Sequence, residues 1–260
     1  MHFSLRYFIQ LSYNGSPFHG WQVQPNASTV QGYINEGLTK LLGKSVEVVG
    51  AGRTDSGVHA RMMMAHFDFI DDLPGDLVYR LNRFLPDEIA IQKIWPVGHL
   101  PGKDGKGAHA RFDAISRTYE YWVARKKDPF LMNRAWYWHG PLDIDLMQQA
   151  ADILKEYKDF ESFSKLHTDV FTFDCRIDEA YFEERGNLLV FTIKADRFLR
   201  NMVRAIIGTL MEVGQGKRSL EDLRKVLLSK DRSMAGTSAP AYGLYLIDVA
   251  YPPEYTSIHE

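Results

Sequence analysis

The sequence has very little cysteine and no long apolar run. Cys175 is the single cysteine among 260 residues, so no disulfide can form within the chain. No apolar run approaches the roughly 18 to 20 residues that a helix needs to cross a bilayer. Residues 1–6 lack the basic segment and apolar core of a secretory signal. These absences predict a cytoplasmic protein that does not enter a membrane.

Several motifs for cofactors and nucleophiles are also missing. The nine histidines show no His-Glu-x-x-His or comparable metal-ligand spacing. The phosphate-binding loop Gly-x-x-x-x-Gly-Lys-Ser/Thr and the Gly-x-Ser-x-Gly elbow of serine hydrolases do not occur. No motif supplies the second acid of a paired-carboxylate glycosidase. We therefore expect no metal and no nucleotide cofactor.

Composition and charge are those of an ordinary globular protein. Hydrophobic residues make up 45% and charged residues 25%, enough for one large core or two moderate ones. The formal net charge of −2 does not by itself indicate a nucleic-acid-binding protein. Binding responds to local charge, however, and we expect Lys and Arg to cluster.

The first half predicts a split β-α-β-β-α-β order, as in ferredoxin-like units. Ser28 is expected to cap the first helix and Gly43 to end it. Apolar periodicity gives, in order, a strand at 6–13, a helix at 29–42, strands at 46–49 and 64–69, a helix at 77–85 and a strand at 89–97.

The glycine-rich loop 98–108 is taken as the boundary, which predicts domains at 1–105 and 106–260. The second half predicts strands at 116–123, 176–182, 188–195 and 244–249, and helices at 143–157, 197–213 and 217–229. Residues 164–172 show no assignable pattern, and the tail after Pro252 is expected to be poorly ordered. The fold class is α+β, with two halves that each mix helices with mainly antiparallel strands.

The residues 52–60 form a glycine-flanked loop between two predicted strands and carry one carboxylate, Asp55. Asp in such a turn commonly caps its own backbone. A dinucleotide-binding loop would need glycine at position 55 and a helix afterwards. A carboxylate held at a rigid loop tip also suits chemistry, with Arg53 two residues away.

Two further patterns each allow two interpretations. Arg197, Arg200 and Arg204 are spaced i, i+3 and i+7 in the predicted helix 197–213, hence on one face. This stripe is either solvated or, in a buried helix, paired with a carboxylate or phosphate. Tyr119 is either a half-buried strand aromatic or a functional residue, and Tyr121 projects on the same face of that strand.

The run Gly-Arg-Thr-Asp-Ser-Gly-Val-His-Ala at 52–60 resembles the signature loop of the tRNA pseudouridine synthase A family, with Ser56 in place of the more usual Ala. Four other runs resemble motifs of the same family, at 13–22, 108–123, 159–163 and 198–204. The resemblance extends from about Arg6 to about Pro252. It implies two ferredoxin-like halves that meet around a central RNA-binding cleft.

The resemblance also implies roles for individual residues. Asp55 is expected to be the catalytic carboxylate and Arg200 its partner, while Tyr119 stacks on the flipped uracil. Arg53 is expected to fill the gap left by the base or to hold the backbone. Arg197 and Arg204 are expected to contact phosphate. Whether Asp55 attacks the sugar, attacks the base or removes a sugar proton stays open.

The function implied is isomerisation of uridine to pseudouridine at tRNA positions 38 to 40, in the anticodon stem-loop. The target base must leave the stack to be reached, and no redox step or cofactor is needed. The family works as a homodimer on tRNA, so a homodimer is expected. Two alternatives stand beside this function: modification of a different RNA site, and RNA binding without catalysis.

Overall fold

The computed structural model describes residues 5–98, 100–165 and 171–256. The chain divides into two compact units, one of residues 1–115 with 246–260 and the other of residues 116–245. The change of unit therefore falls at Ser116, and the last residues return to the first unit, unlike the single cut expected after residue 105. No helix within these described ranges is long and apolar enough to cross a membrane.

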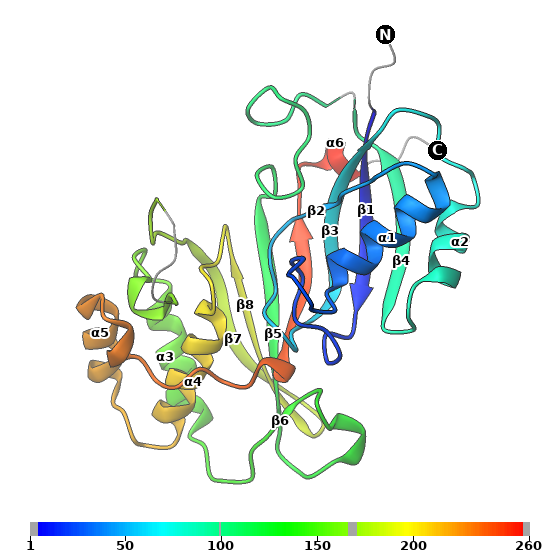
Figure 1. Cartoon of the computed structure of the whole chain (residues 1–260). Helices are drawn as coiled ribbons and strands as arrows, with labels where there is room; N and C mark the ends of the chain where they lie inside the picture. Colours follow the sequence, from blue (N-terminus) through cyan, green and yellow to red (C-terminus); the bar gives the residue numbers. More distant parts are fainter. Residues whose placement is uncertain (1–4, 99, 166–170, 257–260) are drawn as a thin grey trace. The chain divides into compact units, whose positions relative to one another are not determined.

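The first unit has the expected β-α-β-β-α-β order (Figure 1). Strand β1 pairs antiparallel with β3 and β4, and β2 pairs antiparallel with β3, which gives the strand order β4-β1-β3-β2. This arrangement confirms the ferredoxin-like prediction. The elements are β1 (Leu5–Tyr13), α1 (Val30–Leu42), β2 (Val49–Gly50), β3 (His59–Phe69), α2 (Leu77–Phe84) and β4 (Ile89–Pro96).

Helices α1 and α2 pack closely because a glycine faces the contact. A Cβ atom at Gly37 would lie 2.7 Å from Leu81 Cδ1 and 3.0 Å from Phe84 Cδ1, so a side chain there would require these two side chains to shift. The N-cap of α1 is Thr29, whose side chain accepts the Gly32 N–H, and not the expected Ser28. Gly43 ends the helix with a φ of 70°, as predicted.

The strand expected at 46–49 is mostly absent, and this prediction is wrong. Its backbone bonds to side chains of α1 instead of to a neighbouring strand. Val46 N–H donates to Thr39 Oγ1 and Val48 N–H to Asn35 Oδ1, while Gln31 Nε2 donates to Val48 O. Strand β3, in contrast, begins at His59, five residues before the predicted start.

The second unit contains β5 (Ser116–Ala124), β6 (Trp136–Tyr137), α3 (Ile144–Leu154), β7 (Ile177–Arg185), β8 (Leu188–Ala195), α4 (Met202–Gly214) and α5 (Leu220–Ser229). Strand β8 pairs antiparallel with β5 and β7, and β6 pairs parallel with β5. The order of these elements differs from that of the first unit, because β6 follows β5 directly, α5 follows α4, and the next strand in the chain, β9 (Leu244–Ala250), lies mostly in the first unit. Residues 166–170 of the unassigned segment 164–172 lie outside the described residues.

The C-terminal segment completes the first unit. Strand β9 (Leu244–Ala250) is followed by the short helix α6 (Pro253–Thr256). Ile115 N–H donates to Ala250 O, and Trp95 Nε1 donates to Tyr255 O at 2.8 Å. Tyr255 is only 5% exposed because its ring packs against Phe8. The expectation of poor order after Pro252 is therefore wrong for residues 253–256.

Candidate active site

The signature loop of the first unit is held by the segment that follows β1. Tyr13 Oη and Thr54 Oγ1 form a buried hydrogen bond of 2.8 Å. Trp21 N–H donates to Thr54 O at 3.1 Å, and Ser56 Oγ donates to Phe18 O at 3.1 Å. Both neighbours of Asp55 are thus bonded to residues 13–21. The motif at 13–22 therefore supports the signature loop at 52–60.

Two glycines give this loop its shape. Val58 N–H donates to Asp55 O and closes a four-residue turn, in which Gly57 has a φ of 80°, as a type II turn requires. Gly20 has a φ of 93°, and a Cβ atom there would lie 2.5 Å from Thr54 O. The two backbones can approach this closely only because position 20 has no side chain.

The two histidines near the loop bond to backbone. Buried His59 accepts the Gly15 N–H at Nδ1, and buried His66 accepts the Ala110 N–H at Nδ1. Both histidines thus support the backbone through hydrogen bonds. Burial lowers the pKa of His66 to about 4, with further lowering by Arg6. Within the described ranges, no group of His, Cys, Asp or Glu could hold a metal ion.

The carboxylate of the loop is partly accessible. Asp55 is half-buried and Arg53 is exposed, whereas Thr54 between them is buried. The backbone around Asp55 is fixed by hydrogen bonds on both sides. This combination of a fixed backbone and an accessible acidic side chain suits a reacting group.

In the second unit the structure separates Tyr119 from Tyr121. Tyr119 is half-buried, and its ring packs edge-to-face on Phe198 with centroids 5.1 Å apart. Tyr121 is fully buried and donates its hydroxyl to Pro240 O at 2.8 Å. Burial raises the pKa of Tyr121 far above its ordinary value. Of the two tyrosines, only Tyr119 can offer its ring to a ligand.

The three arginines do not share one helix face, so this prediction is wrong. Helix α4 begins at Met202, which leaves Arg197 and Arg200 in the preceding segment. The N-cap residue Asn201 has a φ of 65°, a left-handed conformation that no α-helix can continue through. Asp196 Oδ1 accepts the Arg197 N–H at 2.7 Å, which satisfies that donor outside a helix.

The start of α4 is tied to the loop 235–240. Asn201 Nδ2 donates to Ser238 Oγ at 2.7 Å, and Arg204 Nε donates to Ala239 O at 2.8 Å. The loop lies directly on the helix, because a Cβ atom at Gly208 would meet Thr237 O at 1.8 Å. Arg204 therefore holds a backbone carbonyl, whatever else it contacts.

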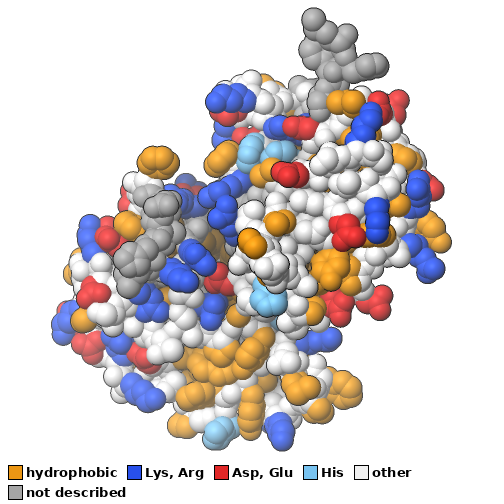
Figure 2. Space-filling view, in the orientation of Figure 1, with side chains coloured by type: hydrophobic (Ala, Val, Ile, Leu, Met, Phe, Trp, Pro, Cys, Tyr) orange, Lys and Arg blue, Asp and Glu red, His pale blue; other side chains and the backbone are white. Residues whose placement is uncertain are grey.

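Arg197 and Arg200 differ in accessibility. Arg197 is half-buried and Arg200 is exposed, and the Arg200 carbonyl accepts the Lys165 N–H at 3.0 Å. Figure 2 shows several Lys and Arg side chains close together over the second unit, in the left half of the view. Positive charge is thus locally concentrated despite the net charge of −2.

Sequence reasoning missed the residues that hold these groups in place. Tyr13 and Thr54 support Asp55, and Asn201 separates Arg200 from the helix. The glycines of the segment 13–22 were the available signal that this segment approaches another backbone closely.

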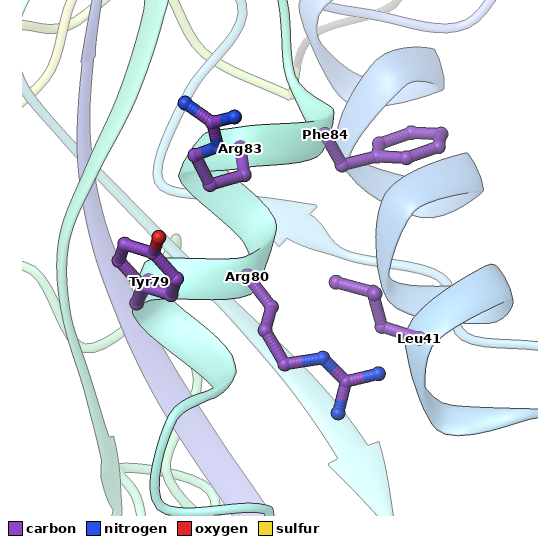
Figure 3. Close-up of a pocket in the computed structure, with 5 residues that line it drawn as sticks. All are labelled: Leu41, Tyr79, Arg80, Arg83 and Phe84. Atoms are coloured by element: carbon purple, nitrogen blue, oxygen red, sulfur yellow. The ribbon is translucent and has the colours of Figure 1, made fainter.

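A shallow hollow on α1 and α2 contains none of the predicted site residues. It is lined by Leu41, Tyr79, Arg80, Arg83 and Phe84 (Figure 3).

Comparison with known proteins defines the class. A family model described as tRNA pseudouridine synthase matches residues 153–252. The tRNA pseudouridine synthase A of Parabacteroides distasonis is 53% identical, with 98% of this chain and 99% of the relative covered. That of Bacteroides thetaiotaomicron is 50% identical over 97% of this chain and 93% of the relative. The tRNA pseudouridine synthase A of Syntrophomonas wolfei is 40% identical over 95% of this chain and 97% of the relative.

These enzymes are pseudouridine synthases, a class of isomerase. The chain belongs to the tRNA pseudouridine synthase A family, because its relatives match it over nearly its full length and nearly theirs. The resemblance found in its motifs is thereby confirmed.

Proposed function

We propose that the protein converts uridine to pseudouridine at positions 38 to 40 of the tRNA anticodon stem-loop, with Asp55 as the catalytic carboxylate. The observation that carries the proposal is the Asp55 turn. Its backbone is fixed by Tyr13, Phe18 and Trp21, while its side chain is left partly accessible. The 53% identity to a tRNA pseudouridine synthase A supports the substrate class.

The reaction rearranges one nucleotide without any co-reactant. The bond between ribose C1′ and uracil N1 breaks, the base turns, a bond forms between C1′ and C5, and the C5 proton moves to N1. A carboxylate can assist by attacking the sugar, by attacking the base or by removing a sugar proton. All three routes need an ionised Asp55 fixed beside an extruded base.

The other residues act on the base and the backbone of the RNA. Tyr119 stacks on the flipped uracil with the exposed part of its ring, and Phe198 holds that ring edge-to-face. Arg200, an exposed residue in the segment before α4, pairs with Asp55 and orients it. Arg53 fills the gap left by the base or holds the RNA backbone.

Arg197 and Arg204 contact phosphate. For Arg204 this contact adds to its bond with Ala239 O, so the same guanidinium joins the loop 235–240 to the RNA. Because α4 begins only at Met202, the two arginines reach phosphate from different elements. Their effects on tRNA binding should accordingly be separable by substitution.

The protein acts as a homodimer, in the cytoplasm where tRNA is found, and needs no metal or nucleotide cofactor. These statements follow from the family resemblance and from the chemistry of the reaction. Size measurement in solution tests the homodimer. Assay in the presence of a chelator tests the independence from metals.

The test is pseudouridine mapping on an unmodified tRNA transcript, with wild type and Asp55→Asn compared. Asn has the size of Asp but cannot act as a base or as an anionic nucleophile. We expect conversion within positions 38 to 40 by the wild type, and binding without conversion by Asp55→Asn. Conversion by Asp55→Asn at the wild-type rate would exclude the role of Asp55.

Two other outcomes would point to the alternatives. Conversion at a different position would indicate another RNA site. Binding of tRNA by both proteins with no conversion by either would favour an RNA-binding protein without catalysis, or a different RNA substrate.

A further inference from the structure

An exposed aromatic ring in the first unit is fixed in place. Phe112 is 61% exposed and belongs to the segment between β4 and β5, the two strands labelled in Figure 1. Its N–H donates to His109 Nδ1 at 3.3 Å, and its carbonyl accepts from Lys103 Nζ at 3.2 Å. Its ring packs on the His109 ring, with centroids 4.3 Å apart and planes 34° apart.

The support beneath this ring reaches the core. The His109 ring contacts buried His66, with centroids 4.5 Å apart. The carboxylate of Asp113, itself 2% exposed, accepts the backbone N–H groups of Lys103 and His109 and the hydroxyl of Tyr255. The loop is thus tied to the core by the His109–His66 contact and by the Asp113–Tyr255 bond, and Phe112 is presented to solvent by a rigid base.

Positive charge flanks the ring. The Arg111 guanidinium lies over the Phe112 ring, 5.6 Å from its centroid. Lys103 and Lys106 are exposed on the same loop, and the exposed acid there, Asp104, accepts the Lys106 N–H. Because Asp113 is buried and bonded, the exposed charged side chains from Lys103 to Phe112 are three cations, Lys103, Lys106 and Arg111, and one acid, Asp104.

We propose that Phe112 is a stacking platform for an unpaired base of the tRNA, and that Arg111 and Lys103 bind the adjoining phosphates. The identity of the RNA rests on the proposed function; the platform itself rests on the geometry above. Unpaired bases stack on exposed aromatic rings, while cations beside the ring bind the backbone. A ring that is already fixed loses little conformational freedom when a base stacks on it.

The occupant is a nucleotide and not an apolar protein surface. Protein interfaces have an apolar core from which charged residues are depleted. Phe112 is instead a single exposed ring with the Arg111 guanidinium over it and Lys103 Nζ bonded to its carbonyl. That charge complements phosphate.

The experiment measures the Kd of an unmodified tRNA transcript at several salt concentrations. We expect Phe112→Leu, which keeps apolar bulk but removes the aromatic face, to weaken binding at least about fivefold at unchanged salt dependence. Phe112→Trp should retain wild-type affinity. Arg111→Gln should reduce the slope of log K against log salt by about one, because one phosphate contact is lost.

The control is Tyr79→Ala. Tyr79 is an aromatic residue, 68% exposed, and lies beside Arg80 and Arg83 on α2 (Figure 3). The Tyr79→Ala substitution should leave tRNA affinity unchanged. This result would separate a specific platform at Phe112 from a general preference of RNA for exposed aromatic residues. Wild-type affinity in Phe112→Leu, or an equal loss in Tyr79→Ala, would overturn the proposal. Thermal unfolding of each variant checks that the fold is kept.

This test is independent of the catalytic assay. If the wild type forms no pseudouridine, the proposed function fails, while the comparison of Kd values still decides whether Phe112 binds RNA. If pseudouridine forms, the Phe112→Leu variant should show its defect in KM for tRNA more than in kcat. A loss of kcat alone, at wild-type Kd, would contradict a binding role.

Discussion

The hydroxyl of Tyr13 lies 2.8 Å from Thr54 Oγ1 in a hydrogen bond buried within the first unit. It links the last residue of β1 to the residue immediately before Asp55. We therefore predict that Tyr13→Phe, which removes only the hydroxyl, lowers the free energy of unfolding by about 1 kcal/mol. It should also lower kcat for pseudouridine formation, because the Asp55 turn loses one of its supports.

A double-mutant cycle with Thr54→Val isolates this bond. If the two hydroxyls act on each other, the double variant should be less impaired than the sum of the two single variants. Fully additive effects on stability and on kcat would show that the Tyr13–Thr54 bond does not hold the turn. Chemical denaturation and single-turnover kinetics supply the two readouts.

Gly20 should not accept any side chain. Its φ of 93° is rarely adopted by L residues, and a Cβ atom would lie 2.5 Å from Thr54 O. We expect Gly20→Ala to destabilise the protein by about 2 kcal/mol or more and to reduce activity strongly. Gly75→Ala is the matched control, since no atom lies within 4 Å of its added Cβ. Equal stability of the two variants in thermal unfolding would contradict the close approach.

The left-handed conformation of Asn201 should control where Arg200 lies. Asn201→Gly keeps access to a φ of 65° and loses the bond to Ser238, whereas Asn201→Val loses the bond and also disfavours that conformation. We predict that Asn201→Val reduces kcat more than Asn201→Gly does. Equal activity of the two variants would show that only the side-chain bond matters.

His66 should make the protein sensitive to moderately acidic pH. Its pKa is lowered to about 4 by burial, whereas an unfolded chain has its histidines near 6.5. Between these values the unfolded state binds more protons, so stability is full above about pH 6.5 and falls as pH drops toward 4. The shift corresponds to about 3 kcal/mol.

The variant His66→Asn should reduce this pH dependence, since Asn can still accept the Ala110 N–H but does not titrate; His109, whose pKa is also lowered by burial, retains part of it. Asp68 and Asp113 do not obscure the test, because their pKa values are lowered from 3.8 and their contribution is lost below this window. Urea unfolding at pH 4.5 and pH 7 provides the measurement. An unchanged difference between the two pH values in the variant would contradict the assignment to His66.

Local pattern was sufficient where the backbone bonds to regular neighbours. Strand β4 was predicted at 89–97 and is found at Ile89–Pro96, and α2 was predicted at 77–85 and is found at Leu77–Phe84. The segment 46–49 has an equally apolar pattern, but its N–H groups bond to Thr39 and Asn35 of α1. Side-chain acceptors on another element cannot be read from periodicity.

The proposed reacting residues of the candidate site could be predicted from the sequence, whereas the residues that hold them in place could not. Asp55 and Tyr119 were found through motifs, and the structure leaves both partly accessible. The prediction that the helix starts at Arg197 was wrong. The helical spacing of apolar residues extends back to Phe198, but the left-handed backbone of Asn201 prevents the helix from starting before Met202. The roles of Asp55, Tyr119 and Arg200 in the reaction stay predictions.

The return of the C-terminal segment has a consequence for how the chain is made. Residues 116–245 of the second unit all leave the ribosome before residues 246–256, which complete the first. Tyr251 and Tyr255 pack on Phe8, near the start of the chain, so the first unit reaches its final packing only once residue 255 has emerged. The unit whose synthesis begins first therefore cannot finish folding until the whole of the second unit has emerged.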